Sequence, residues 1–100
     1  MITKYMGYCI ICSKPKDDIH HCFKGNKQRH LADEDKLVIP VCRECHEKIH
    51  KQKELNVLVE IIGQLQYEKQ YMAEKIELPF ENIEEEARES FRIRYSRSYL

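Results

Sequence analysis

The chain has 100 residues, of which 42% are hydrophobic and 34% are charged, and its formal net charge is zero. A chain of this length forms one domain, or a small core with an appendage, and its hydrophobic core is modest. The composition excludes a disordered chain, and no stretch approaches the ~20 apolar residues of a transmembrane helix. Residues 1–8 carry one lysine and no long apolar run, so we expect no secretory signal there.

The charge is unevenly distributed along the chain. Residues 1–50 carry nine Lys and Arg against seven Asp and Glu, whereas residues 51–100 carry eight against ten. The first half is therefore slightly basic, which gives it a small electrostatic bias toward an anionic partner such as nucleic acid.

Two short strands are predicted in the first half. Residues 18–23 form the first, and the β-branched, apolar residues 36–41 form the second. Pro40 places the second strand at an edge or near its end. Residues 24–35, between the strands, are polar and contain a Gly-Asn pair, so we predict a loop.

Three helices are predicted after the strands. The first covers residues 43–53. The second ends at Pro79 and is weakened locally by Gly63, and its apolar residues fall largely on one stripe: Leu55, Leu58, Val59, Ile62, Leu65, Met72 and Ile76. The third covers residues 81–99, with an acidic start and a basic end that suit the helix dipole. Its apolar positions recur every four residues: Ile83, Ala87, Phe91 and Tyr95.

Four of the five cysteines form two Cys-x-x-Cys pairs separated by 29 residues, namely Cys9 with Cys12 and Cys42 with Cys45. In a reducing compartment, such pairs are metal ligands more often than disulfides. Zinc prefers four tetrahedral ligands, and thiolates supply them. A redox dithiol would need only one pair, so the spacing predicts a structural zinc that clamps the ends of the intervening segment. Cys22 stands alone and is expected to be a small core residue.

The five histidines are His20, His21, His30, His46 and His50. His46 directly follows the last paired cysteine, and His50 lies four residues later, so both share one helical face that can bind a cation. Adjacent strand residues point to opposite faces, so His20 and His21 should have different roles. One can join the metal, while the other acts as a base, because a neutral imidazole with a pKa of about 6.5 accepts a proton from water. His30 has no partner at useful spacing and is expected on the surface.

Two segments resemble a known motif: Asp-Ile-His-His at residues 18–21, and Val-Ile-Pro-Val-Cys-Arg-Glu-Cys-His at residues 38–46. They look like the HNH (ββα-metal, His-Me finger) endonucleases, in particular the small phage-encoded type that is stapled by zinc. The motif covers residues 9–50. The resemblance implies a small α+β fold, with a zinc-stabilised ββα-metal core in residues 1–53. Residues 54–100 would form a helical extension that packs on the core or mediates oligomerisation.

The resemblance also implies roles for the histidines. His20 matches a ligand of the catalytic ion, His21 the general base, and His46 the final ligand of the motif. His50 matches an additional helical ligand of the colicin-type DNases. The implied cofactors are a structural Zn²⁺ and a catalytic divalent ion, which could be Mg²⁺, Mn²⁺, Ni²⁺ or Zn²⁺. The implied reaction is hydrolysis of nucleic-acid phosphodiesters, with double-stranded DNA as the expected partner.

The sequence departs from the family at its middle asparagine. In many members this residue lies shortly before the second cysteine pair, where residues 36–38 are Lys-Leu-Val. Asn26, soon after the paired histidines, is the candidate to brace the base instead. Lys24, Lys27 and Arg29 lie in the same segment, where they either contact phosphates or form a solvated loop.

A different class of function stays open because of that departure. The zinc knuckle could support a catalytically inactive module that binds nucleic acid or protein, with the C-terminal helices as a homodimer or partner surface. In this interpretation His20 and His21 are ordinary strand residues. His46 is an alternative zinc ligand, and His50 is a solvated residue. We expect no membrane partner and a cytoplasmic location, which is the bacterial host cytoplasm if the protein is phage-encoded.

Overall fold

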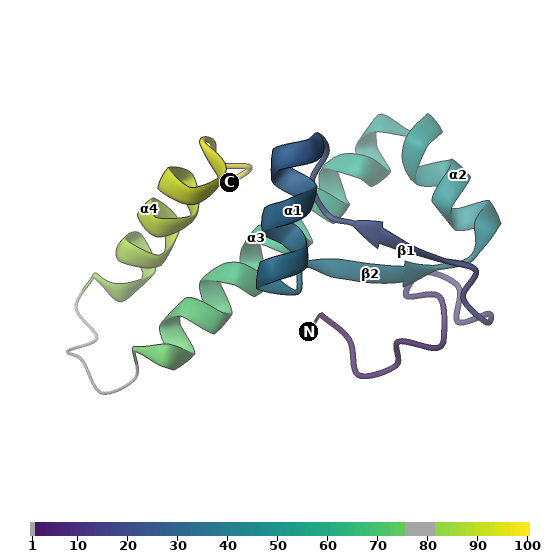
Figure 1. The fold of residues 1–100 in the computed structure, drawn as a ribbon, viewed down its shortest axis with the longest axis horizontal. Coiled ribbons are helices and arrows are strands. Elements are labelled where there is room, and N and C mark those ends of the chain that lie inside the picture. The colour runs from purple at the N-terminus through teal and green to yellow at the C-terminus, as the bar shows by residue number, and fades with distance from the viewer. Residues whose placement is uncertain (1, 76–81) are drawn as a thin grey trace.

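The computed structural model describes residues 2–75 and 82–100, and these form a small α+β fold with a two-stranded sheet and four helices. In chain order the elements are β1 (Asp18–His21), α1 (Asn26–Asp35), β2 (Val38–Val41), α2 (Arg43–Lys51), α3 (Lys53–Glu74) and α4 (Ile83–Tyr95). Figure 1 shows the sheet and α2 at one end, the antiparallel pair of α3 and α4 at the other, and α1 between them. Within the described ranges, no helix is long and apolar enough to cross a membrane.

The sheet is a single antiparallel pair, in which His20 lies opposite Ile39 and Ile19 opposite Pro40. Since each strand has only one neighbour, both are edge strands, and the expected edge position of Pro40 is confirmed. The outer side of β2 is used by the N-terminal segment, because the Ile10 amide donates to the Pro40 carbonyl at 2.9 Å. The first cysteine pair is thereby docked against the sheet.

The predicted loop at residues 24–35 is wrong, because α1 occupies Asn26–Asp35. Its apolar pattern is short, with only Ala32 fully buried, so periodicity gives little signal. Contacts distant in sequence hold it instead: the Gln28 side chain donates to the Tyr95 carbonyl at 2.7 Å. The helix ends at Lys36, whose left-handed backbone (φ 59°) turns the chain into β2.

Helix α3 buries only part of the predicted apolar stripe. Val59 is buried and Leu55 packs against the core, but Leu58 and Leu65 are about half exposed, at 51% and 50%. The rest of the buried face carries Gly63, Gln64 and Glu68. Of the predicted boundaries, Ile76, Pro79 and the start of the last helix at residue 81 lie outside the described residues.

The core joins the sheet to the C-terminal helix through aromatic rings. All four apolar positions predicted for the last helix are buried, so that spacing is confirmed. Phe23, just after β1, packs against Tyr95 with ring centroids 4.8 Å apart and stacks on Tyr99 at 5.3 Å. Gly63 of α3 lets this happen, because an added Cβ would lie 2.8 Å from the Phe23 ring. The division into residues 1–53 and 54–100 stays a prediction.

Candidate metal centres

The four paired cysteines meet at one point, with their sulfurs all within 4.8 Å of one another. Cys12 and Cys42, from different pairs, have sulfurs 3.6 Å apart. Four sulfurs around a zinc ion at 2.3 Å would be separated by about 3.8 Å, and a disulfide would need about 2 Å. Cys9, Cys42 and Cys45 are buried, whereas Cys12 is exposed. The cluster can therefore hold a metal ion, and the geometry fits four thiolates around one centre.

Local backbone turns position these sulfurs. The Ser13 amide donates to the Cys9 carbonyl at 2.9 Å, and Ser13 adopts a left-handed conformation (φ 66°) that closes the first turn. In the second pair, Cys42 caps α2, and its sulfur accepts from the Cys45 amide at 3.5 Å. The Asp17 carboxylate accepts from the Arg43 amide at 2.8 Å, so α2 begins at a fixed place beside β1.

Electrostatics favour a cation between the cysteines. Burial alone raises the pKa of Cys9, but backbone N–H groups of Cys42, Cys12 and Ile11 lower it to about 6. Burial and the neighbouring sulfurs raise the pKa of Cys45 to about 12. Four thiolates cannot all ionise in contact without a compensating positive charge, and a bound metal ion provides it.

Three of the five histidines form a second cluster, on the other side of the start of α2. The ligand nitrogens of His20, His46 and His50 lie within 4.8 Å of one another. Ring centroids are 5.2 Å apart for His20 and His46, and 4.8 Å for His46 and His50. The last two come from adjacent turns of α2, as their spacing predicts, and the strand brings in His20. Three imidazoles can hold one divalent ion.

Neighbouring groups favour metal binding by two of these rings, those of His20 and His46. Burial, followed by the nearby His46 and His50, lowers the pKa of His20 to about 4, so this ring stays neutral near pH 7. The Nδ1 of His46 lies 3.1 Å from a carboxylate oxygen of Asp18. Such a partner fixes the ring and leaves Nε2 for an ion. Asp18 belongs to the motif segment at residues 18–21, but its contact with His46 carried no sequence signal, because the two are 28 residues apart.

His21 is not one of the three clustered histidines. Its Nε2 lies 2.8 Å from an oxygen of Asp33, on α1, and its side chain is 29% exposed. Within the described residues, the side chain bonded to His21 is therefore Asp33 rather than Asn26, which begins α1. His30 lies on the surface, where it pairs with Glu34 one turn along α1.

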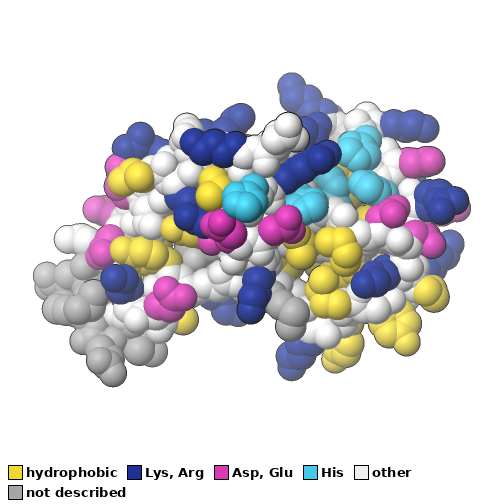
Figure 2. Space-filling view, in the orientation of Figure 1, with side chains coloured by type: hydrophobic (Ala, Val, Ile, Leu, Met, Phe, Trp, Pro, Cys, Tyr) yellow, Lys and Arg dark blue, Asp and Glu magenta, His cyan; other side chains and the backbone are white. Residues whose placement is uncertain are grey.

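The histidines line a hollow of about 570 Å³ at the junction of β1, α1 and α2. His20, His21, His46 and His50 share it with Lys24 and Arg29. Figure 2 shows histidine side chains gathered on this face, with Lys and Arg side chains beside them. Two of the three predicted phosphate contacts thus lie at the histidine hollow.

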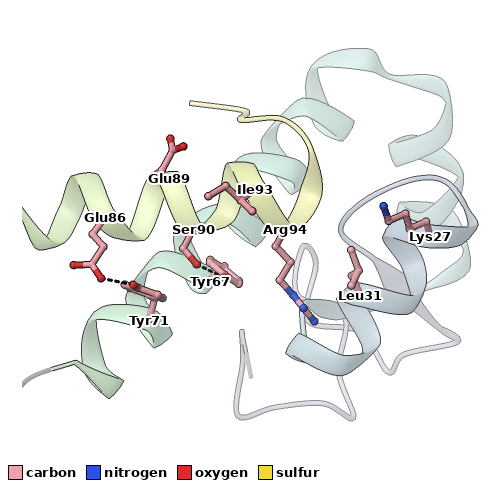
Figure 3. A pocket seen from close by; sticks show the side chains of 9 residues that line it. All are labelled: Lys27, Leu31, Tyr67, Tyr71, Glu86, Glu89, Ser90, Ile93 and Arg94. Carbon is pink, nitrogen blue, oxygen red and sulfur yellow. Dashed lines mark hydrogen bonds between the residues drawn. The ribbon is translucent and has the colours of Figure 1, made fainter.

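Lys27 instead lines a larger hollow of about 700 Å³ between α1, α3 and α4 (Figure 3). Four of the polar groups that line this second hollow pair with one another. The hydroxyl of Tyr71 donates to Glu86 at 2.6 Å, and the hydroxyls of Tyr67 and Ser90 are 2.8 Å apart. Among the described residues, neither metal-ligand cluster borders it. The candidate histidine ligands and His21 therefore border the smaller hollow.

Comparison with protein families gives one match, which covers residues 3–78. The chain belongs to the DUF968 family. That family is described as proteins of unknown function. The matched range contains both ligand clusters, Asp18 and Asp33, and it stops before α4. No curated protein and no solved structure matches this DUF968 member.

Proposed function

We propose that this protein is a metal-dependent HNH endonuclease with a ββα-metal core that hydrolyses nucleic-acid phosphodiester bonds. The observation that carries the proposal is the arrangement of four histidines around one hollow. Three converge as ligands for an ion, and the fourth, His21, lies beside them with a different bonding partner. A closed structural site would use a fourth protein ligand, whereas three ligands leave a position for substrate or water.

The cysteine cluster supports the proposal as a structural zinc site. It joins the segment before β1 to the start of α2, and the next residue after Cys45 is the ligand His46. The proposed zinc does no chemistry. It holds the first turn of α2 so that His46 and His50 face His20 across the sheet end.

The residues of the hollow then divide the work. His20, His46 and His50 would hold a divalent ion, which supplies positive charge to the scissile phosphate. His21 accepts a proton from water, the water oxygen bonds to phosphorus, and the bond from phosphorus to the leaving oxygen breaks. Lys24 and Arg29 border the hollow and would bind neighbouring phosphates. DNA is the proposed substrate, through the resemblance to HNH enzymes.

The test is cleavage of supercoiled plasmid with Mg²⁺, Mn²⁺ or Ni²⁺, comparing the wild type with His21→Ala. Loss of a general base should slow cleavage by about 10²–10⁴-fold. His30→Ala is the matched control, because it removes a histidine that pairs with a carboxylate on α1 outside the hollow. Cleavage unaffected by His21→Ala would remove the mechanism. DNA binding without any cleavage would favour the inactive binding module.

A further inference from the structure

The hydrogen bond between His21 and Asp33 is not explained by metal binding. His21 follows the ligand His20 on β1, yet its ring bonds to α1 instead of the three-histidine cluster. An ionised carboxylate only accepts hydrogen bonds, so the bonded Nε2 must carry the proton. Nδ1 is then the ring nitrogen with a free lone pair, and it is the atom that can accept a proton.

Asp33 is held by the way α1 is anchored to the C-terminal helix. The next two residues, Glu34 and Asp35, both bind the guanidinium of Arg94, at 2.8 and 2.7 Å. The Tyr95 hydroxyl also donates to Asp35, at 2.6 Å. The last turn of α1 is thus clamped to α4 next to the residue that contacts β1. A group that must orient a catalytic side chain works best from such a fixed element.

A second histidine–carboxylate pair on α1, His30 with Glu34, is a solvent-exposed contact for comparison. His30 and Glu34 are four residues apart and 3.1 Å from each other, and the His30 side chain is 75% exposed. Such solvated pairs contribute little to stability. The His21 side chain is only 29% exposed and lines the hollow, and its partner comes from a different element.

We infer that Asp33 is a positioning residue, which holds His21 in the Nε2–H tautomer so that Nδ1 takes the proton from water. This inference rests on the proposed nuclease function. Asp33, on α1, thus takes the role of holding the base that the sequence suggested for Asn26. The proton moves from water to Nδ1, the oxygen–phosphorus bond forms, and the bond to the leaving oxygen breaks with its electron pair on that oxygen, which takes a proton from the solvent.

The first test is kinetic, with Mn²⁺-dependent cleavage measured over a range of DNA concentrations. Asp33→Ala should lower kcat by about 10–100-fold, the range found for the partners of metal-bound histidines, and leave KM unchanged. Asp33→Asn should lose less, because its amide oxygen still accepts from Nε2–H. His30→Ala, the control, should match the wild type. An unchanged kcat for Asp33→Ala overturns the inference.

A double variant shows whether Asp33 acts through His21. In the His21→Ala background, Asp33→Ala should have no further effect on the cleavage rate, because the group that it positions is gone. A further loss of tenfold or more, equal to that of the single variant, would mean that Asp33 acts separately, and it contradicts the inference. The side chain of Asp33 is 63% exposed, so the variants should fold, and thermal unfolding checks this.

The second test reads the tautomer without any cleavage. Ring ¹⁵N NMR spectra of the 12.1 kDa protein, at a pH where imidazole is neutral, should show His21 as the Nε2–H form. Asp33→Ala should give a mixture of tautomers. A mixture already in the wild type overturns the inference even if the protein cleaves DNA. If the wild type holds the single tautomer but cleaves with none of the ions, the proposed function fails while the Asp33 contact stands.

Discussion

The two clusters of candidate metal ligands differ in how they are enclosed. The cysteine cluster offers four ligands and is largely buried, so an ion there would have a complete tetrahedral shell. The histidine cluster offers three ligands and opens onto a hollow shared with basic side chains. Both depend on the first turns of α2, where Cys45 and His46 are adjacent residues. In the proposed function, one helix start would serve both a structural centre and a reactive one.

The largest expected effect comes from removing one ligand of the four-cysteine cluster. Cys42→Ser removes a thiolate ligand, while its hydroxyl can still cap α2, so we expect loss of bound zinc and of cooperative unfolding. Structural zinc supplies about 10–16 kcal/mol in small zinc-finger peptides. The matched control is Cys22→Ala, since Cys22 is buried outside the cluster and should leave the zinc content unchanged. Metal analysis and circular dichroism measure both, and a folded Cys42→Ser protein without zinc would contradict a structural role.

The open centre should lose its ion without loss of the fold. The wild type should bind one zinc ion that resists mild chelation and a second, exchangeable divalent ion. His46→Ala should abolish binding of the second ion and retain the first, because three ligands drop to two. Titration calorimetry with Mn²⁺ or Ni²⁺ gives the stoichiometry. A wild type that binds a single ion in total would weaken the comparison between the two centres.

A smaller effect, on stability, should follow from adding a side chain on α3 where it packs against the residues just after β1. In Gly63→Ala, the new Cβ would lie 2.7 Å from the Cys22 Cβ and 2.8 Å from the Phe23 ring. Overpacking of this kind costs about 1–3 kcal/mol of unfolding free energy. Gly7→Ala is the control, because its Cβ would meet nothing within 4 Å. Denaturant unfolding of the zinc-loaded protein measures both, and equal stability would place the close packing in doubt.

The smallest effect concerns the basic residues. Arg29 lines the histidine hollow and Lys27 lines the other one, although they are two residues apart. Arg29→Ala should therefore reduce the salt dependence of DNA binding by about one phosphate contact, and Lys27→Ala should leave it unchanged. Fluorescence anisotropy at several salt concentrations measures the slopes. Equal slopes for both variants would mean that DNA does not follow the histidine hollow.

Local spacing was enough to predict the cysteine cluster and the pairing of His46 with His50, whereas His20 was chosen over His21 through the resemblance to HNH enzymes. The two-residue spacing of the cysteines and the four-residue spacing of His46 and His50 are fixed by turn and helix geometry, so no fold was needed to interpret them. The four-residue repeat of α4 was equally visible. By contrast, α1 has few apolar residues and depends on Gln28 and Arg94 contacts far along the chain. Its Lys-Gln-Arg and Leu-Ala residues are good helix formers, and that propensity was the available signal.

The contacts of the two carboxylates with their histidines could not have been predicted. Asp33 and Asp18 reach their histidines across 12 and 28 residues, and exposed acidic residues are common in any chain. The role of Gly63 was hidden for a similar reason. In sequence it only weakens a helix, whereas in the fold it is the point where α3 meets the residues after β1. These features become visible only when elements distant in sequence are packed together.

The buried amide of Gln64 has a consequence for the uniqueness of the fold. Its nitrogen donates to Glu68 at 2.9 Å and to Ser98 at 3.0 Å, and its oxygen accepts from the Tyr99 amide at 2.6 Å. A slip of α4 along α3 by one turn would break the bonds to Ser98 and Tyr99, which follow α4, and would leave the buried amide with only its bond to Glu68 within α3. Gln64 therefore acts as a register pin, which selects one alignment of the helix pair and seats Tyr99 on Phe23.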